Sequence, residues 1–214
     1  MSFASIEHKM SFFHIPRAGG TSISRSILMG ENERLWKYNT KSGVRPNTWT
    51  RTGFYTIESY YNEFRRLPEW SFAVVRNPYE RCLSIWAYND HGQDDLTSKK
   101  DRWKIFLNNC GYWTQTYEKA PSSFRSIPHH ILPAHCFVSI KNKTAVNALI
   151  KMENINLIPQ IVSDNTRIDL KISKLPRLNK SNSADFVDAF MDEESMEHIR
   201  NIYTKDFQLY RKAI

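Results

Sequence analysis

One segment near the start of the chain, SFFHIPRAGGTSISR (residues 11–25), limits what this sequence can fold into more than any other. Residues 11–15 form a short apolar run that is typical of a buried strand. Residues 16–20 contain two adjacent glycines, and the residues after them show apolar side chains at helical spacing. The segment therefore predicts a strand, a glycine turn and a helix over residues 21–29.

Such a junction favours binding of a phosphate or sulfate. A strand, a glycine turn and a helix start gather several backbone N–H groups around one point, and the helix dipole adds partial positive charge. Gly19 and Gly20 let the backbone approach an anion closely and adopt a positive φ. Arg17 adds a fixed charge, and two hydroxyl side chains follow the glycines. The predicted anion-binding residues are Arg17, Ala18, Gly19, Gly20, Thr21 and Ser22.

A glycine pair alone is also explained by an ordinary turn between a strand and a helix, with no ligand. A Walker A loop fits less well, because it requires G-x-x-x-x-G-K-[ST]. Here a single residue separates Arg17 from the glycine pair, and no lysine precedes Thr21.

A second strand-to-helix junction spans residues 70–86. The run WSFAVV (70–75) is typical of a buried strand, and Pro78 suits the first turn of a helix. Arg76 lies at the predicted strand end, while Arg81 and Ser84 lie in the helix. Taken singly, Arg76 is better explained as a capping or surface residue and Ser84 as a small packing residue.

Together, the two junctions resemble the nucleotide motifs of sulfotransferases that use 3′-phosphoadenosine-5′-phosphosulfate (PAPS). FHIPRAGGTS (13–22) resembles their 5′-phosphosulfate loop, most closely in the carbohydrate-type branch of heparan 2-O- and chondroitin sulfotransferases and their bacterial relatives. Arg76, Arg81 and Ser84 stand in an R-x-P-x-x-R-x-x-S pattern that resembles the family's 3′-phosphate signature. Arg17 replaces the usual lysine, so a planar fork takes the place of a compact ammonium.

Weaker similarity extends over nearly the whole chain. Residues 128–135 (PHHILPAH) resemble a His-x-x-Pro-Gln segment that precedes a strand, although Ala134 replaces the glutamine. A late basic segment resembles the family's Asn-x-Ser segment near the cofactor. This implies that Arg177, Asn179 and Ser181 contact the nucleotide, and a solvated basic loop explains each of them equally well.

The alternation of strands and helices predicts an α/β fold with a mainly parallel sheet. The resemblance implies one P-loop-like, three-layer domain over residues 1–214. It also implies transfer of a sulfuryl group from PAPS to a hydroxyl or amine acceptor, a carbohydrate or small metabolite, with adenosine 3′,5′-bisphosphate as product. Both motifs follow predicted strand ends, where open α/β sheets bind ligands.

The same patterns predict the remaining elements. These are a helix over 57–66, a loop or solvated helix over 89–104, strands over 136–140 and 148–152, a helix over 155–162, and a terminal amphipathic helix with its stripe from Met196 to Tyr210.

Composition narrows the partners. The net charge of +8 fits an anionic ligand, whether nucleotide, acidic glycan or nucleic acid, and it also fits simple solubility. Because the cations are scattered and form no recognised module, we expect no nucleic-acid partner. The sequence lacks a long apolar run and a signal-peptide pattern, so we expect a cytoplasmic enzyme without a membrane partner. The oligomeric state is left open.

The alternative function is a P-loop phosphotransferase that depends on Mg²⁺. Such enzymes hold the metal with a loop hydroxyl and an acidic residue at a strand end. Here the strand ends in Arg76, which would repel a cation, so we expect no metal. The three cysteines, Cys82, Cys110 and Cys136, form no C-x-x-C pair, and they indicate neither a zinc site nor a disulfide framework.

Sulfuryl transfer also needs a base that accepts the acceptor's proton, and a histidine pKa near 6.5 suits that role. His130 aligns with the family's His-x-x-Pro and ranks first, and His91, after the second predicted helix, ranks second. Each histidine taken singly is better explained by packing or surface exposure. Glu58 and Glu153 are the carboxylate alternatives. Arg17, with the loop amides, would stabilise charge on the leaving phosphate.

Overall fold

The computed structural model describes residues 2–5, 10–23, 56–89, 95–120, 128–166, 175 and 186–214. Its contacts divide the chain into two compact units. Unit 1 consists of Met1–Val75, Ala134–Asn179 and Lys212–Ile214. Unit 2 consists of Arg76–Pro133 and Lys180–Arg211.

Unit 1 is built on a sheet of four strands in the order β1-β2-β3-β6. The strands are β1 (Phe3–Ser5), β2 (Met10–Phe12), β3 (Trp70–Val75) and β6 (Ala148–Lys151). β2, β3 and β6 run parallel, and β1 pairs antiparallel with β2. The predicted mainly parallel sheet is therefore confirmed, as are the strands over 70–75 and 148–151.

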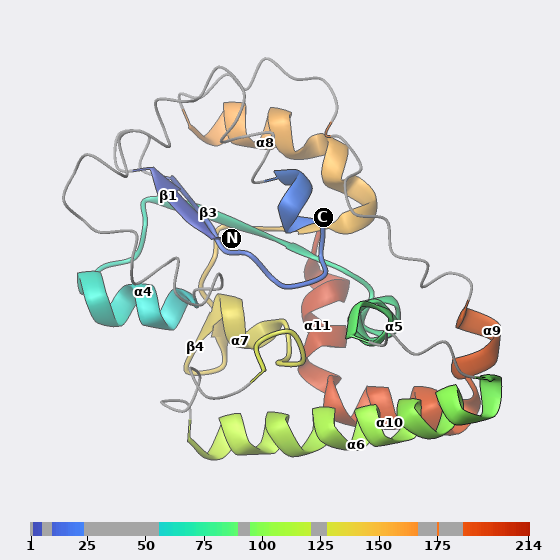
Figure 1. The fold of residues 1–214 in the computed structure, drawn as a ribbon. Coiled ribbons are helices and arrows are strands. Elements are labelled where there is room, and N and C mark those ends of the chain that lie inside the picture. Colours follow the sequence, from blue (N-terminus) through green and yellow to red (C-terminus); the bar gives the residue numbers. More distant parts are fainter. Residues whose placement is uncertain are drawn as a thin grey trace. The chain divides into compact units, whose positions relative to one another are not determined.

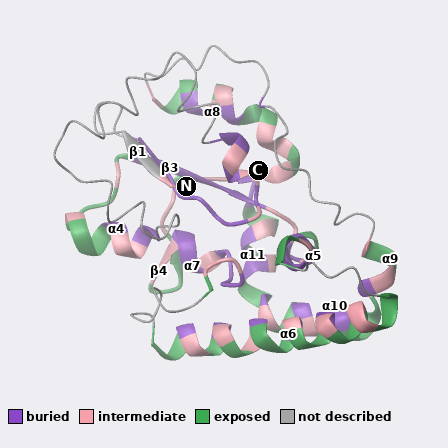
Figure 2. Ribbon diagram, in the orientation of Figure 1, coloured by how far each residue is buried: buried purple, intermediate pink, exposed green. Residues whose placement is uncertain are grey.

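β3 is buried along its whole length, as Figure 2 shows. A parallel strand that is covered on both faces requires a nearly continuous apolar run, and WSFAVV supplies one. In Figure 1, α8 (Ile158–Asn165) lies on one side of the strands, whereas α4 (Ile57–Phe64) and α7 (His135–Val138) lie on the other.

α4 confirms the helix predicted over 57–66, except for its last two residues. The Thr56 side chain caps its start by accepting the Ser59 amide at 3.0 Å. The helix ends where Arg65 takes a left-handed conformation with φ 53° and its amide donates to the Tyr61 carbonyl. Both ends are therefore set by local hydrogen bonds.

The strand predicted over 136–140 is wrong for its first three residues. His135–Val138 form the short helix α7, and only Ser139–Ile140 form a strand, β4, which pairs with β5 (Lys143–Thr144). A short apolar run has no period that separates a buried strand from a buried helix. Here the Phe137 amide donates to the Ala134 carbonyl at 3.1 Å, and the segment is helical.

Two other boundaries of unit 1 differ from the sequence patterns. β2 ends at Phe12, three residues before the predicted strand end at residue 15, and the turn begins at residue 16. The helix predicted over 155–162 is instead a 3₁₀ segment, η2 (Met152–Leu157), followed by α8, which carries a proline in its first turn.

Unit 2 is helical. It contains α5 (Pro78–Asn89), α6 (Leu96–Lys119), α9 (Val187–Phe190), α10 (Glu193–Ile202) and most of α11 (Thr204–Lys212). The segment 89–104, predicted as a loop or solvated helix, contains the beginning of the long helix α6. Asp95 caps this helix by accepting the Thr97 and Ser98 amides at 2.8 and 3.0 Å. No helix within the described ranges is long and apolar enough to cross a membrane.

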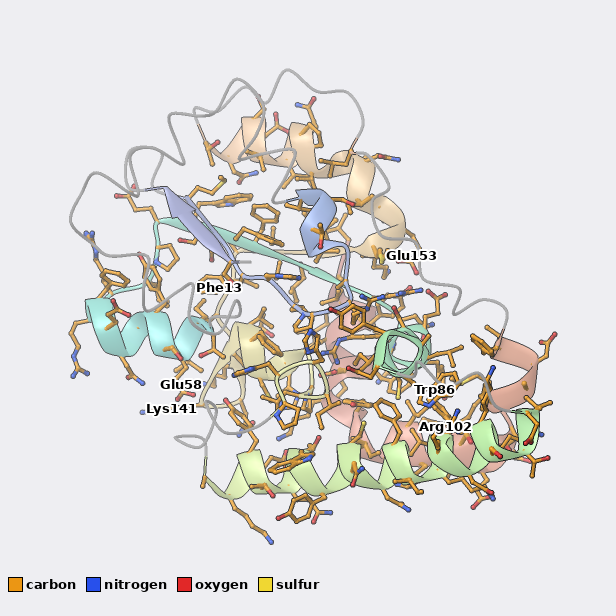
Figure 3. The ribbon with its side chains drawn as sticks, viewed as in Figure 1. Phe13, Glu58, Trp86, Arg102, Lys141 and Glu153 are labelled. Carbon is orange, nitrogen blue, oxygen red and sulfur yellow. The ribbon has the colours of Figure 1, made fainter. Side chains whose placement is uncertain are left out.

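An aromatic cluster forms the core of unit 2. Trp86 of α5 meets Trp103 of α6 edge to face, with ring centroids 5.8 Å apart, and it also contacts Phe190 of α9 at 4.6 Å. Figure 3 labels Trp86 at this position. The terminal helix predicted from one apolar stripe is divided into α10 and α11 at Tyr203, whose buried ring belongs to the same core.

Candidate functional site

The glycine turn of unit 1 follows β2 directly. The Phe13 amide still donates to the Phe72 carbonyl of β3 at 2.9 Å, and the chain then leaves the sheet. Residues 16–19 form turns, and residues 20–23 are helical. The Ser22 and Ile23 amides both donate to the Gly19 carbonyl, at 3.0 and 3.3 Å, so the helix starts immediately after Gly19.

The two glycines are required for different reasons. Gly19 has φ +77°, in the left-handed region, and a Cβ there would also lie 3.0 Å from Ile155 Cδ1. At Gly20, a Cβ would overlap the imidazole ring of His14. Gly19 is therefore required by its backbone conformation. Gly20 is required because the His14 ring occupies the space of a Cβ.

His14 holds its place in the turn through both its backbone and its ring. Its amide donates to the Ser2 hydroxyl oxygen at 2.9 Å. The imidazole is buried and stacks on Phe12, with ring centroids 6.0 Å apart. The His14 ring therefore packs directly against Gly20.

The six predicted residues of the first motif, 17–22, span the end of the turn and the first residues of the helix. Arg17 lies in the left-handed region at φ 64° and is half-buried, as are Gly19 and Thr21. Ala18 and Ser22 are buried. The amides of Gly20 and Thr21 lie in the first turn of the helix. Amides in the first turn have no carbonyl acceptor within the helix. Their N–H groups and the Arg17 guanidinium are of the kind that binds an anion.

The second motif begins where β3 ends. Asn77 precedes α5, and its side-chain oxygen accepts the Tyr79 amide at 3.0 Å, which fixes the start of the helix. Arg76 is partly exposed, and its Nε donates to Glu80 Oε2 at 3.1 Å. Because the Glu80 carboxylate is largely exposed, this ion pair contributes little and can be exchanged for another anion. Ser84 of the same motif is buried.

Arg81 is the most deeply placed cation of the motif, with a side chain only 2% exposed. Its Nη2 donates to the carbonyl oxygens of His130 at 3.2 Å and Leu132 at 2.8 Å. Its Nη1 lies 3.8 Å from Oδ2 of Asp206, a carboxylate 3% exposed. The structure therefore separates two residues of this motif: Arg76 is near the surface, while Arg81 faces the interior of unit 2.

His130, the first-ranked candidate base, is half-buried in the segment that Arg81 holds. The ring of Tyr88, on the last turn of α5, lies beside its imidazole, with centroids 5.6 Å apart and an interplanar angle of 34°. The second-ranked His91 lies outside the described residues. So do Arg177, Asn179 and Ser181.

Both carboxylate candidates belong to unit 1. Glu58 is in the first turn of α4, and Glu153 lies on η2 after β6. In Figure 3 they lie on opposite sides of the sheet. η2 also carries Ile155, which stands against Gly19, so Glu153 belongs to the element that contacts the glycine turn and Glu58 does not.

Two buried groups near the Arg81 network have raised pKa values. Burial is the main cause of the raised pKa of the Tyr203 hydroxyl and of the Cys82 thiol. It keeps both groups neutral near neutral pH. All three cysteines are free and buried, and the Cys82 thiol, with its raised pKa, is chemically inert. Among the residues that the structure describes, no three His, Cys, Asp or Glu side chains are grouped as a metal site requires.

Sequence reasoning missed the His14 ring behind Gly20, the interior position of Arg81, and the parts played by Tyr88 and Tyr203. The first could be sought from the sequence, because two adjacent glycines after a strand indicate a close approach of some group. The other three have no local signal, since their partners lie far away in the sequence.

Comparison with known proteins gives one match. The model of the sulfotransferase family matches residues 2–213. No curated protein and no solved structure matches the chain.

Proposed function

Since this chain belongs to the sulfotransferase family, we propose that it transfers a sulfuryl group from PAPS to a hydroxyl or amine acceptor. The observation that supports this most directly is the turn after β2, where a left-handed Arg17, two glycines with distinct requirements and a helix start come together within six residues. The proposal treats the two units as one sulfotransferase domain, in keeping with the extent of the family match.

The turn of unit 1 has the chemistry that a 5′-phosphosulfate needs. The missing Cβ of Gly20 leaves room for the His14 ring, and the helix-start amides can donate to phosphate or sulfate oxygens. Arg17 adds a fixed positive charge that stabilises negative charge on the leaving phosphate. PAPS, when bound, supplies the activated sulfuryl group. We assign Arg17, Ala18, Gly19, Gly20, Thr21 and Ser22 to this part of the nucleotide.

The 3′-phosphate is assigned to the second motif. Arg76 follows β3, whose carboxyl end lies at the same sheet edge as that of the parallel strand β2. Its surface partner, Glu80, is weakly held and replaceable by a phosphate. Ser84 is assigned to the 3′-phosphate from the family signature, and Arg177, Asn179 and Ser181 are assigned to the nucleotide on the same basis.

His130 is proposed as the base that accepts the acceptor's proton, with His91 second. A half-buried imidazole that contacts an aromatic ring keeps a defined orientation while retaining access to a proton. If a carboxylate serves instead, Glu153 is the better of the two, because its element contacts the glycine turn.

The acceptor is proposed to be a glycan hydroxyl, as in the carbohydrate-type branch that the first motif resembles. The test is incubation of the full chain with PAPS and each of three acceptors: desulfated heparan, chondroitin and a simple phenol. Formation of adenosine 3′,5′-bisphosphate and sulfated product is expected with a polysaccharide. Binding of the bisphosphate, measured by thermal shift, should exceed that of ATP with Mg²⁺. Activity that disappears in EDTA and returns with Mg²⁺ would contradict the proposal and favour a phosphotransferase.

A further inference from the structure

Three consecutive carbonyl groups in unit 2 are held by two buried side chains. Arg81 of α5 donates to the carbonyls of His130 and Leu132, at 3.2 and 2.8 Å. Between them, the carbonyl of Ile131 accepts the hydroxyl of Tyr203 at 2.8 Å. Tyr203 lies between α10 and α11, so a turn with little regular structure of its own is fixed from two directions.

Helix α5 also contacts the side chain of His130 in that turn. Tyr88, near the end of α5, places its ring beside the His130 imidazole. α5 therefore contacts His130 twice, at its carbonyl through Arg81 and at its ring through Tyr88. Arg76, assigned to the 3′-phosphate, lies two residues before the start of this helix.

We propose that Arg81 is a positioning residue rather than a nucleotide ligand. Together with Tyr203 it fixes the turn 130–132, so that the His130 imidazole keeps one position relative to α5. The inference rests on the proposed function, and it reassigns one residue of the motif that resembles the 3′-phosphate signature.

Electrostatics favour this assignment over a phosphate contact. A phosphate at Arg81 would bring further negative charge beside the buried carboxylate of Asp206. Charges of one sign are costly to hold together where the dielectric is low. The guanidinium instead satisfies backbone carbonyls, groups that must find donors when a turn is buried. A planar fork with several donors suits two carbonyls and a carboxylate together, and an ammonium would not.

Holding a base by its backbone has a consequence for catalysis. The tether acts on the backbone carbonyl of His130, so the position of the residue is fixed through its main chain. Displacement of a catalytic group by about 1 Å can cost on the order of 10²-fold in rate. Loosening the tether should therefore lower turnover while nucleotide affinity is retained.

The experiment compares Arg81→Lys and Tyr203→Phe with the control Tyr112→Phe, which changes an exposed tyrosine of α6 in the same unit. Calorimetry gives the Kd of adenosine 3′,5′-bisphosphate, and bisphosphate release from PAPS with desulfated heparan gives turnover at saturation. We expect turnover to fall about 10²-fold in Arg81→Lys and about tenfold in Tyr203→Phe. The Kd should stay within about twofold, and the control should match the wild type.

A rise of tenfold or more in Kd with unchanged saturated turnover would overturn the inference, because that is the behaviour of a nucleotide ligand. If Arg81→Lys does not fold, Tyr203→Phe decides alone, since it removes a single hydroxyl. A second readout is the NMR signal of the His130 ring, identified by its loss in His130→Gln. It should shift or broaden in Tyr203→Phe, and an unchanged signal would overturn the tether even if the wild type used no PAPS. A wild type that neither binds the bisphosphate nor uses PAPS refutes the proposed function separately.

Discussion

Arg17 and Arg81 belong to the two motifs that resemble a nucleotide site, yet their surroundings differ in nearly every respect. Arg17 is half-buried in a turn, in a left-handed conformation with φ 64°. Arg81 lies inside a helix, 2% exposed, against a buried carboxylate and two backbone carbonyls. Membership of a motif therefore does not decide what an arginine does; burial and the charge of its neighbours do. Arg17 has the surroundings of a ligand-binding residue, and Arg81 those of an internal tether.

The largest effect expected from this contrast is on stability at Arg81. Arg81→Ala leaves the Asp206 carboxylate and two carbonyls buried without this cation, so the free energy of unfolding should fall by about 3–5 kcal/mol. Urea denaturation followed by circular dichroism measures it. The control is Lys205→Ala, which breaks the exposed pair with Glu118 and should change stability by less than about 1 kcal/mol. Equal effects for the two variants would contradict the interior role of Arg81.

At Arg17, the expected loss is in rate rather than in stability. Removing a donor that stabilises a developing negative charge lowers turnover by about 10²–10³-fold. The turnover of Arg17→Ala should fall by this factor, while its bisphosphate affinity changes less. Arg17→Lys should retain much of the activity, because lysine is the usual residue at this position of the family motif. An Arg17→Lys variant as inactive as Arg17→Ala would show that the guanidinium fork itself is needed.

The contact between Gly20 and the His14 ring in the glycine turn can be tested by substitution. Gly20→Ala drives a methyl group into the His14 ring, and overpacking of this kind costs about 1–3 kcal/mol. Gly111→Ala on α6 is the control, because its Cβ would lie 3.8 Å from Ile202 of α10, at ordinary contact distance. That variant should be neutral or more stable by up to about 1 kcal/mol, owing to helix propensity. Thermal unfolding compares them, and restoration of stability in the double variant Gly20→Ala, His14→Ala would identify the ring as the obstacle.

The smallest effect concerns a purely local contact, the cap of α10. Hydrogen bonds from the Ser195 amide lower the pKa of the Asp192 carboxyl, which accepts that amide at 2.8 Å. A lowered folded-state pKa means that the stabilisation is present above the ordinary value of 3.8 and is lost as the pH falls through the folded value. Asp192→Ala should cost about 1 kcal/mol at neutral pH and less at low pH, because a neutral carboxyl accepts the Ser195 amide more weakly than the carboxylate does. Asp192→Asn should keep the cap with no such dependence on pH, and a cost in Asp192→Ala that persists unchanged at pH 2 would contradict the assignment.

The sequence by itself determined the elements whose signals are local. WSFAVV was typical of a strand covered on both faces, Pro78 marked the start of α5, and the pair Gly19–Gly20 marked the turn after β2. Thr56 and Arg65 similarly define α4 through contacts within a few residues. Each of these features depends on backbone conformation, solvent exposure along one segment, or a hydrogen bond over one turn, all of which adjacent residues control.

The rest was decided by contacts between residues far apart in the chain. The stripe 196–210 has one helical period, yet the chain divides at Tyr203, whose hydroxyl reaches Ile131. The run 136–140 had an apolar pattern that suits strand or helix, and its first residues form a helix that lies beside α4. Arg81 stood in a sequence motif for a phosphate, and only its distance to Leu132 and Asp206 showed an internal role. Local propensities differ by about 1 kcal/mol or less per residue, whereas burying a charged group without a partner costs several, so the long-range contacts prevail wherever the two disagree.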